Sequence, residues 1–322
     1  MPVRVGVISS AHVHAPSFVA CCQASPQAEV VGLWDDDFER GRKFASERGI
    51  AFFEDIDALC GQVEAVVVCS ENMKHADQIE VAARHGLHIL CEKPVAPRPE
   101  HAARIESAVG KDKVFMTAFP CPFSPAFQSV NQKVKDGVIG RVLAVSATNQ
   151  GTCPFGWFVE TDKSGGGAMV DHTVHVTDLL RRLLGEEPAT VQAMTGNNVY
   201  GKDWEDTAMV SVGFPSGVFA TIDSSWSKPA SYKTWGNVKL TVVGEKGVIE
   251  TDLFTQGYDV YSGKHYQAGV GSNLDQMMVD EFLDAVMAGR EPSITLHDGL
   301  QASRVAMAAY RSVSNGGAVV TL

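Results

Sequence analysis

Apolar runs and amphipathic stretches alternate along the first third of the chain. The run Val3–Ile8 is almost continuously apolar, as expected for a strand that is covered on both faces. Further strand-like runs follow, separated by helix-like stretches; the runs are 29–34, 65–69, 87–91 and 114–118, and the stretches are 39–47, 74–85 and 99–109. Strands that alternate with helices at this spacing pair in parallel through right-handed crossovers. The pattern therefore predicts an α/β fold with a doubly wound, Rossmann-type parallel sheet.

The pattern changes near residue 120, where Pro120, Pro122 and Pro125 interrupt the chain. Strand-like runs with turn signals between them follow from residue 190 to residue 250, and they indicate a large open sheet that is mostly antiparallel. Helical patterns accompany this sheet at 127–136, 168–184, 274–288 and 296–313. We predict a Rossmann domain over residues 1–119 and a second α/β domain, for substrate binding and oligomerisation, over residues 120–322. The C-terminal helix of the second domain can pack back on the first.

Composition and charge narrow the class of protein. The 322 residues are 45% hydrophobic and 20% charged, with a formal net charge of −11, so a general affinity for nucleic acid or anionic membranes is not expected. No apolar run is long enough to span a bilayer, and the N-terminus lacks the features of a secretory signal. The seven cysteines include no CxxC pair and indicate buried, reduced thiols. These observations predict a cytoplasmic protein without a nucleic-acid or membrane partner.

The loop after the first strand is a degenerate form of a nucleotide-binding motif. In the motif G-x-G-x-x-G, the glycines allow a tight turn and a close approach of the backbone to a pyrophosphate. Here Ser9 and Ala11 stand at the first two glycine positions and His14 stands at the third. Serine and alanine still permit that approach if neither position needs a positive φ. We therefore expect a dinucleotide to lie against Ser9, Ser10, Ala11 and His12.

An acidic residue, Asp35, ends the second predicted strand, where a ribose-binding carboxylate belongs. Asp36 and Asp37 follow it, and three carboxylates would repel a 2′-phosphate, so we expect NAD rather than NADP. An equally weighted alternative is that these residues only cap the next helix. His12 and His14 either face the pyrophosphate or lie in solvent. A metal ion there would need further converging ligands, and we predict none.

Glu92 and Lys93 follow the fourth predicted strand, at the edge where ligands bind in doubly wound sheets. A lysine in that place can donate to a substrate hydroxyl and stabilise developing alkoxide charge. Pro94 would stiffen the turn that holds it. For an isolated motif of this kind, the alternative is an exposed Glu–Lys pair before a turn.

The helical pattern at 168–184 carries further candidate groups. Asp171, His175 and Asp178 are four and then three residues apart, so they share one face of the helix. A carboxylate one turn from an imidazole can fix its tautomer and raise its basicity, as a base for alcohol oxidation requires. His172, beside this face, is either a supporting or a structural residue. A metal site formed by His172 and His175 is not predicted, because their spacing differs from that of zinc-binding helices.

Together these segments resemble the glucose–fructose oxidoreductase / inositol dehydrogenase / MocA family. The resemblance covers nearly the whole chain and rests on the E-K-P motif at 92–94, the segment G-G-G-x-x-x-D-x-x-x-H-x-x-D at 165–178, and the stretch 70–75. It implies that Lys93 contacts substrate and cofactor, that His175 is the acid/base, and that Asp171 binds or orients the substrate. It also implies cofactor contacts from residues near two strand ends, namely Ser70, Asn72, His75 and Glu92. Trp157 and His172 are candidate substrate contacts, although a core role for the tryptophan is equally plausible.

The implied function is hydride transfer between NAD and a secondary alcohol of a sugar, cyclitol or related polyol. Two alternatives stay open. The first is NAD-dependent glycoside hydrolysis by transient oxidation and elimination. The second is a non-catalytic, ligand-sensing relative, against which the intact Lys93, Asp171 and His175 weigh. A homodimer or homotetramer is expected by analogy with the family.

Overall fold

The computed structural model describes the backbone of the chain except at residues 233, 256, 263 and 270, and the side chains except at 233 and 256–270. The chain divides into two compact units. The first unit consists of Met1–Pro120, Asp162–Gly165 and Asn273–Leu300, and the second of Cys121–Thr161, Gly166–Ser272 and Gln301–Leu322. A single boundary near residue 120 does not describe this division, because two later segments belong to the first unit.

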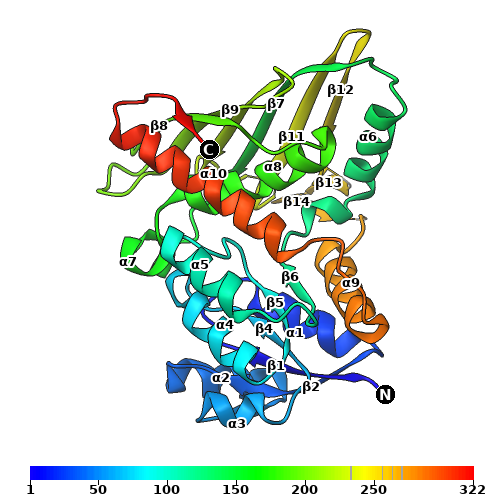
Figure 1. Cartoon of the computed structure of the whole chain (residues 1–322), viewed down its shortest axis with the longest axis vertical. Coiled ribbons are helices and arrows are strands. Elements are labelled where there is room, and N and C mark those ends of the chain that lie inside the picture. Colours follow the sequence, from blue (N-terminus) through cyan, green and yellow to red (C-terminus); the bar gives the residue numbers. More distant parts are fainter. Residues whose placement is uncertain (233, 256, 263, 270) are drawn as a thin grey trace. The chain divides into compact units, whose positions relative to one another are not determined.

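Six parallel strands form the sheet of the first unit (Figure 1). Their order across the sheet is β3-β2-β1-β4-β5-β6. In chain order they are β1 (Val3–Ile8), β2 (Ala28–Trp34), β3 (Ala51–Phe53), β4 (Ala65–Val68), β5 (His88–Cys91) and β6 (Phe115–Thr117). The neighbouring central strands β1 and β4 are buried almost throughout, which explains why their sequences are continuous apolar runs rather than alternating ones.

Helices connect the strands of the first unit: α1 (Ala15–Ala24), α2 (Phe38–Arg48), α3 (Ile56–Cys60), α4 (His75–Arg84) and α5 (Pro99–Ala108). A further helix, α9 (Leu274–Ala288), comes from much later in the chain and contacts α1. The Ser17 hydroxyl donates to the Asp275 carboxylate over 2.5 Å, and the Gln276 side-chain amide donates to the Cys21 carbonyl over 3.1 Å. These bonds attach α9 to the N-terminal unit.

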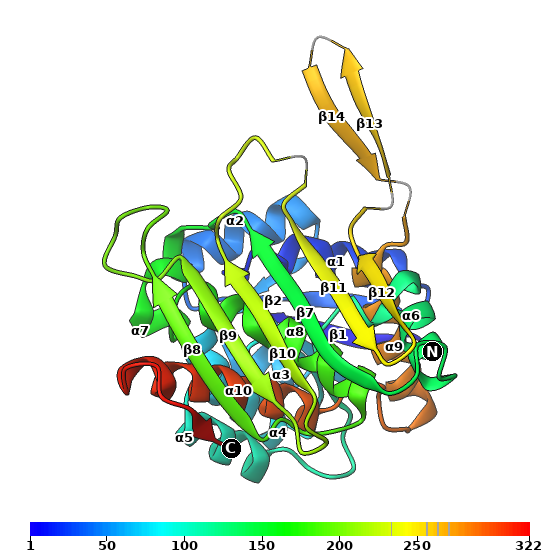
Figure 2. The same cartoon turned by 90° about the horizontal axis from the view of Figure 1, so that it is seen from above.

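A seven-stranded sheet dominates the second unit, in the order β12-β11-β7-β10-β9-β8-β15 (Figure 2). Every neighbouring pair is antiparallel except β7 and β10, which are parallel. In chain order these strands are β7 (Val142–Gly151), β8 (Thr190–Gly196), β9 (Thr207–Gly213), β10 (Phe219–Ser225), β11 (Gly236–Gly244), β12 (Gly247–Asp252) and β15 (Val320–Thr321). A separate hairpin pairs β13 (Gly257–Ser262) with β14 (Lys264–Gly269).

One face of the seven-stranded sheet packs against α8 (Ala168–Leu184), the longest helix that lies wholly in the second unit. Apolar side chains of the helix, including Met169, Val176 and Leu180, join those of the strands in one buried cluster. The remaining helical segments that include residues of this unit are η2 (Cys121–Phe123), α6 (Pro125–Lys135), η3 (Gly156–Val159), α7 (Thr161–Ser164) and α10 (Leu296–Ser314). The predicted fold class, a parallel Rossmann-type sheet plus a mostly antiparallel open sheet, is confirmed.

Two short elements, β3 and α3, were not predicted by the periodicity. They contain three and five residues, which is too short for a period of 2 or 3.6 to be recognised. Helix α6 also begins two residues before the predicted start, because Pro125 occupies its first turn, where proline is favoured. No helix in the described part of the chain is long and apolar enough to cross a membrane.

Candidate functional site

The loop between β1 and α1 has a strained residue at the position of the first motif glycine. Ser9 is fully buried and has φ of +66°, a left-handed conformation that is unfavourable for a serine by about 1–3 kcal/mol. Its backbone N–H donates to the carbonyl of Trp34 over 2.6 Å. The condition set by the sequence, that neither Ser9 nor Ala11 needs a positive φ, is therefore not met at Ser9. The loop nevertheless has the turn that a glycine would normally provide.

Asp35, at the end of β2, is fully buried and holds this loop in place. Its carboxylate accepts hydrogen bonds from the backbone N–H and the hydroxyl of Ser10, both 2.8 Å long, and from Nε of Arg40 at 3.0 Å. Burial would raise the pKa of Asp35, but these bonds outweigh burial and lower it. The helix-capping alternative applies to Asp37, which accepts from the Arg40 N–H at the start of α2. A ribose contact from Asp35 stays a prediction.

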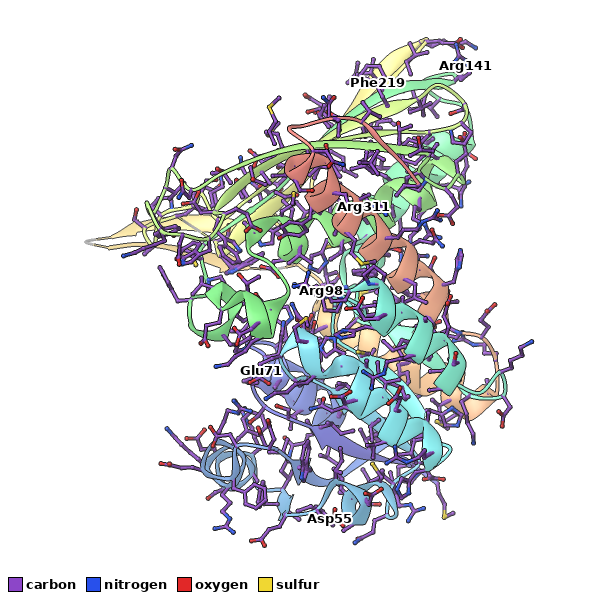
Figure 3. The ribbon with its side chains drawn as sticks, turned by 60° about the vertical axis from the view of Figure 1, so that its left-hand side comes forward. Asp55, Glu71, Arg98, Arg141, Phe219 and Arg311 are labelled. Carbon is purple, nitrogen blue, oxygen red and sulfur yellow. The ribbon has the colours of Figure 1, made fainter. Side chains whose placement is uncertain are left out.

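Arg40 and Lys74 connect Asp35 to further charged groups of the first unit. One guanidinium nitrogen of Arg40 lies 3.6 Å from a Glu71 carboxylate oxygen, and Lys74 Nζ lies 2.9 Å from the other. Arg40 and Lys74 also pair with Asp36. Figure 3 labels Glu71 in this group. The side chains of Arg40 and Lys74 therefore lie among three carboxylates, those of Asp35, Asp36 and Glu71. The sequence had suggested a group of carboxylates without cations.

The residues at these strand ends fit a dinucleotide. Helix α1 begins without a side-chain cap and without an acidic residue in its first turn, as anion binding at a helix N-terminus requires. The Ser70 hydroxyl is fully buried after β4 and has no hydrogen-bond partner among the described residues, so a ligand group can satisfy it. Two nearby side chains already contact backbone carbonyl groups of the protein. Asn72 Nδ2 donates to the Ser164 carbonyl over 2.8 Å, and His75 Nδ1 lies 2.9 Å from the Pro94 carbonyl oxygen.

Glu92 and Lys93 are both buried after β5, with exposed fractions of 0% and 4%, so the exposed-pair alternative does not describe them. One Glu92 oxygen accepts the Lys93 backbone N–H over 3.0 Å. The other oxygen lies 2.8 Å from Nδ1 of His14 and 3.3 Å from Nδ1 of His12. Burial would raise the pKa of Glu92, but the two imidazoles hold it well below its ordinary value. Glu92 is therefore a carboxylate that ties the E-K-P turn to the β1–α1 loop.

In the second unit, Asp171 is almost completely buried near the start of α8. The indole N–H of Trp226 donates to its Oδ2 over 3.1 Å, and Nε2 of His172 lies 3.3 Å from the same oxygen. His172 is itself fully buried, with its ring edge-on to Trp226 and Trp235. These contacts give His172 a role in positioning Asp171. A substrate contact from His172 stays a prediction.

His175 and Asp178 follow on α8, and both are buried. Both carboxylate oxygens of Asp178 accept from Nε of Arg182, at 3.1 and 2.9 Å. Asp178 therefore forms an ion pair one turn further along its own helix. Of the three residues that share this face of the helix, Asp171 and His175 are therefore the candidates for the catalytic groups.

The glycines before α8 are required by groups that lie far away in the sequence. The Gly167 N–H donates to Glu205 Oε1 over 2.6 Å and to the Tyr310 hydroxyl over 3.1 Å. A Cβ on Gly166 would lie 1.9 Å from the Tyr310 hydroxyl oxygen, and one on Gly167 would lie 2.4 Å from the Glu205 carbonyl oxygen. The glycine run thus makes room for a partly buried Glu205–Tyr310 pair. Sequence reasoning missed Glu205, Tyr310 and Trp226 as supporting residues.

Trp157 belongs to an aromatic cluster of the second unit. Its ring stacks on Phe158 with 3.9 Å between ring centroids. The cluster also contains Tyr200, Trp204 and Trp226. The indole of Trp226 in this cluster is the one that donates to Asp171. The aromatic cluster therefore contacts the buried carboxylate of Asp171 through Trp226. A substrate contact from Trp157 stays a prediction.

Known proteins match the chain over most of its length. Residues 3–119 match an oxidoreductase family with an NAD-binding Rossmann fold, and residues 127–250 match the GFO/IDH/MocA C-terminal domain. A 1,5-anhydro-D-fructose reductase of Ensifer adhaerens is 27% identical over 97% of each chain. An inositol 2-dehydrogenase of Rhizobium meliloti is 30% identical over 80% of this chain and 82% of its own. The crystal structure of a Lactobacillus casei myo-inositol dehydrogenase with NAD(H) and myo-inositol has the same fold, with a TM-score of 0.84, 23% identity, and coverage of 100% of this chain and 97% of that one.

Replacing Asp35 by asparagine is expected to lower the free energy of unfolding at pH 7 by about 1–3 kcal/mol, because Arg40 loses a buried partner. The folded-state pKa of Asp35 is lowered, so its contribution is complete above the ordinary pKa of about 3.9 and is lost as the pH falls through the folded value. Urea unfolding between about pH 5 and pH 3 should therefore show a steeper loss of stability for wild type than for Asp35→Asn. The exposed carboxylate variant Glu250→Gln is the control, and equal slopes for all three proteins would contradict the assignment.

Proposed function

Because the chain belongs to the GFO/IDH/MocA oxidoreductase family, we propose that it transfers a hydride reversibly between NAD and a secondary alcohol of a sugar, cyclitol or related polyol. Membership confirms the resemblance seen in the sequence, NAD as the cofactor and an NAD-dependent oxidoreductase as the class of enzyme. The substrate class is our inference from two relatives whose names refer to inositol and to anhydrofructose.

The observation that carries the proposal is the arrangement at the start of α8. Asp171 is buried, is held at Oδ2 by the Trp226 indole N–H, and stands one helical turn before the buried His175. A fixed carboxylate one helical turn from a buried imidazole is suited to proton transfer, because its charge favours the protonated ring. Alcohol oxidation requires such a base, since the hydroxyl proton must leave when the hydride does.

Each candidate residue has a separate role in the proposed reaction. Bound NAD supplies the hydride acceptor. His175 removes the hydroxyl proton, and Asp171 orients the substrate and stabilises the charged imidazole. Lys93 donates a hydrogen bond to the substrate oxygen and stabilises its developing negative charge. Glu92 fixes the backbone N–H of Lys93 and thereby the turn that carries the lysine.

We expect Lys93→Ala and His175→Ala each to lower kcat by about 10²–10⁴-fold, the range for loss of a general acid–base or charge-stabilising group. NAD affinity should change by less than about tenfold, because the dinucleotide also contacts the loop and strand ends. Steady-state NADH formation over a panel of cyclitols, aldoses and sugar acids measures kcat. Quenching of tryptophan fluorescence by NAD measures the NAD affinity.

The surface variants His85→Ala and Lys43→Ala are the matched controls for that experiment and should retain wild-type rates. Unchanged turnover in both Lys93→Ala and His175→Ala would refute the proposed roles. Cleavage of a glycoside without accumulation of NADH would favour the transient-oxidation alternative. NAD binding without turnover of any substrate by wild type would favour a non-catalytic, ligand-sensing protein.

The preference for NAD over NADP should depend on Asp35. This carboxylate neutralises Arg40, and its removal in Asp35→Ser would free the guanidinium to bind a 2′-phosphate. We expect the ratio of kcat/KM for NADP to that for NAD to rise at least tenfold. Asp37→Ser is the control, because serine still caps α2 and leaves Asp35 and Arg40 in contact. A wild type that prefers NADP would contradict the expected specificity.

We further propose that the open face of the seven-stranded sheet pairs with a second copy of the chain. Met194, Met209 and Phe219 lie on this face with 69%, 54% and 58% of their surfaces exposed, and Figure 3 labels Phe219. Apolar groups exposed together on one sheet face favour association.

We also propose a cytoplasmic location. The seven cysteines are buried free thiols, which supports a reducing, cytoplasmic location.

The variant Met209→Glu should shift the protein from dimer or tetramer toward monomer, because a charge on this face is unfavourable to bury. Light scattering after size-exclusion chromatography at micromolar concentration measures the mass. Met287→Glu introduces the same change at an α9 position that is also 54% exposed, and it should leave the mass unchanged. A monomeric wild type would refute the proposal.

A further inference from the structure

We propose that His12, His14 and Glu92 form a binding site for a divalent transition-metal ion such as Zn²⁺, with three protein ligands and one open coordination position. The site goes beyond the proposed hydride transfer; it shares His12 and Glu92 with the expected cofactor contacts, and its test does not depend on turnover. Each of the three residues offers one ligand atom, and these atoms all lie within 4.8 Å of one another. In the part of the chain that the structure describes, no other group of histidine, cysteine and acidic residues converges in this way.

Two rigid strand ends bring the ligands together. His12 and His14 lie in the loop after β1, and Glu92 directly follows β5. The strand between them in the sheet is β4. The His12 N–H donates to the Cys69 carbonyl over 2.9 Å, and the Glu92 N–H donates to the Val68 carbonyl over 3.0 Å. The loop that carries His12 and the turn that carries Glu92 are therefore both hydrogen-bonded to the end of β4, as a preorganised site requires.

The separations between the donor atoms suit a small tetrahedral ion. Zinc–nitrogen and zinc–oxygen bonds of about 2.0–2.1 Å place neighbouring ligand atoms about 3.3 Å apart. Nδ1 of His12 lies 3.3 Å from Glu92 Oε1, and Nδ1 of His14 lies 2.8 Å from it. The His14 side chain is 37% exposed, so it can move outward by the half ångström that coordination needs.

The orientation of the donor groups also favours a cation. The second Glu92 oxygen is occupied by the Lys93 backbone N–H, which turns the first oxygen toward the two imidazoles; anchoring of a ligand by a group outside the metal shell is usual in such sites. Nδ1 of His12 accepts the His14 backbone N–H over 3.2 Å, and a metal ion bound at Nδ1 would replace this hydrogen bond. Nδ1 of His12 and Oε1 of Glu92 thus lie close together, and a metal ion would bind both atoms with the imidazole in its unprotonated form.

The burial of the cluster fits a site with limited access. The side chains of His12 and Glu92 are 1% and 0% exposed, whereas His14 forms the open side. Three protein ligands with an open fourth position are characteristic of zinc sites that bind a further molecule. The sequence did not predict this site, because it gave no third ligand for the two histidines. Glu92 is that ligand, and it lies 78 residues from His14.

Calorimetric titration of the chelator-treated full-length protein with ZnCl₂ tests the site. We expect one ion per chain with micromolar or tighter affinity, and Co²⁺ should give visible absorption bands typical of a four-coordinate ion with nitrogen and oxygen ligands. His14→Ala and Glu92→Gln should each weaken binding by about 100-fold or more. His85→Ala, which removes a histidine elsewhere in the first unit, is the control and should bind as wild type does.

Thermal unfolding supplies a second measurement in case Glu92→Gln folds poorly. Zn²⁺ should raise the Tm of wild type and of His85→Ala, but not that of His14→Ala. Absence of Zn²⁺ binding to wild type, or equal binding by wild type and His14→Ala, would overturn the proposal and leave the cluster as a hydrogen-bonded His–Glu network. Neither measurement uses turnover, so failure of the metal site and failure of the proposed dehydrogenase activity are distinguishable.

Discussion

The burial of ionised carboxylates is the constraint on which the first unit depends. A carboxylate removed from water is unfavourable by several kcal/mol unless charged or N–H partners compensate it. Asp35 obtains these partners from Ser10 and Arg40, and Glu92 obtains them from the Lys93 N–H and the two loop histidines. Each compensation joins segments that come from different strand ends. The need to satisfy these charges therefore holds together the loops at the edge of the sheet where we propose that the cofactor binds.

The larger elements of the fold could be predicted because they are long compared with their hydrophobic period. Apolar runs such as Val3–Ile8 and the pattern of α8 determine which faces are buried, and burial then selects parallel or antiparallel pairing. The short elements β3 and α3 contain less than two periods and left no readable pattern. The membership of 273–300 in the first unit was equally inaccessible, because local periodicity does not say which surface a helix covers.

The candidate site could be predicted only where spacing along one element decides geometry. Asp171 and His175 are one turn apart on α8, so the sequence alone placed them on one face. The same rule also included Asp178, which the structure pairs with Arg182 instead. The partner that holds Asp171, Trp226, lies 55 residues away, directly after β10. Contacts of this kind depend on tertiary structure, and residue spacing carries no signal for them.

The degenerate glycine loop shows how a motif can be absent while its conformation is present. Glycine is favoured in such loops because it adopts positive φ without steric strain. Ser9 adopts a positive φ as well. Three hydrogen bonds hold it there: its N–H donates to the Trp34 carbonyl, and its hydroxyl oxygen accepts from the Ala11 N–H and from the Arg40 guanidinium. A strained residue persists only when its surroundings over-determine it. These hydrogen bonds restrain the loop, and a restrained loop loses less entropy when it binds a ligand. Hydrogen bonds replace glycine in defining the turn, and for this reason a search for glycines alone does not find this loop.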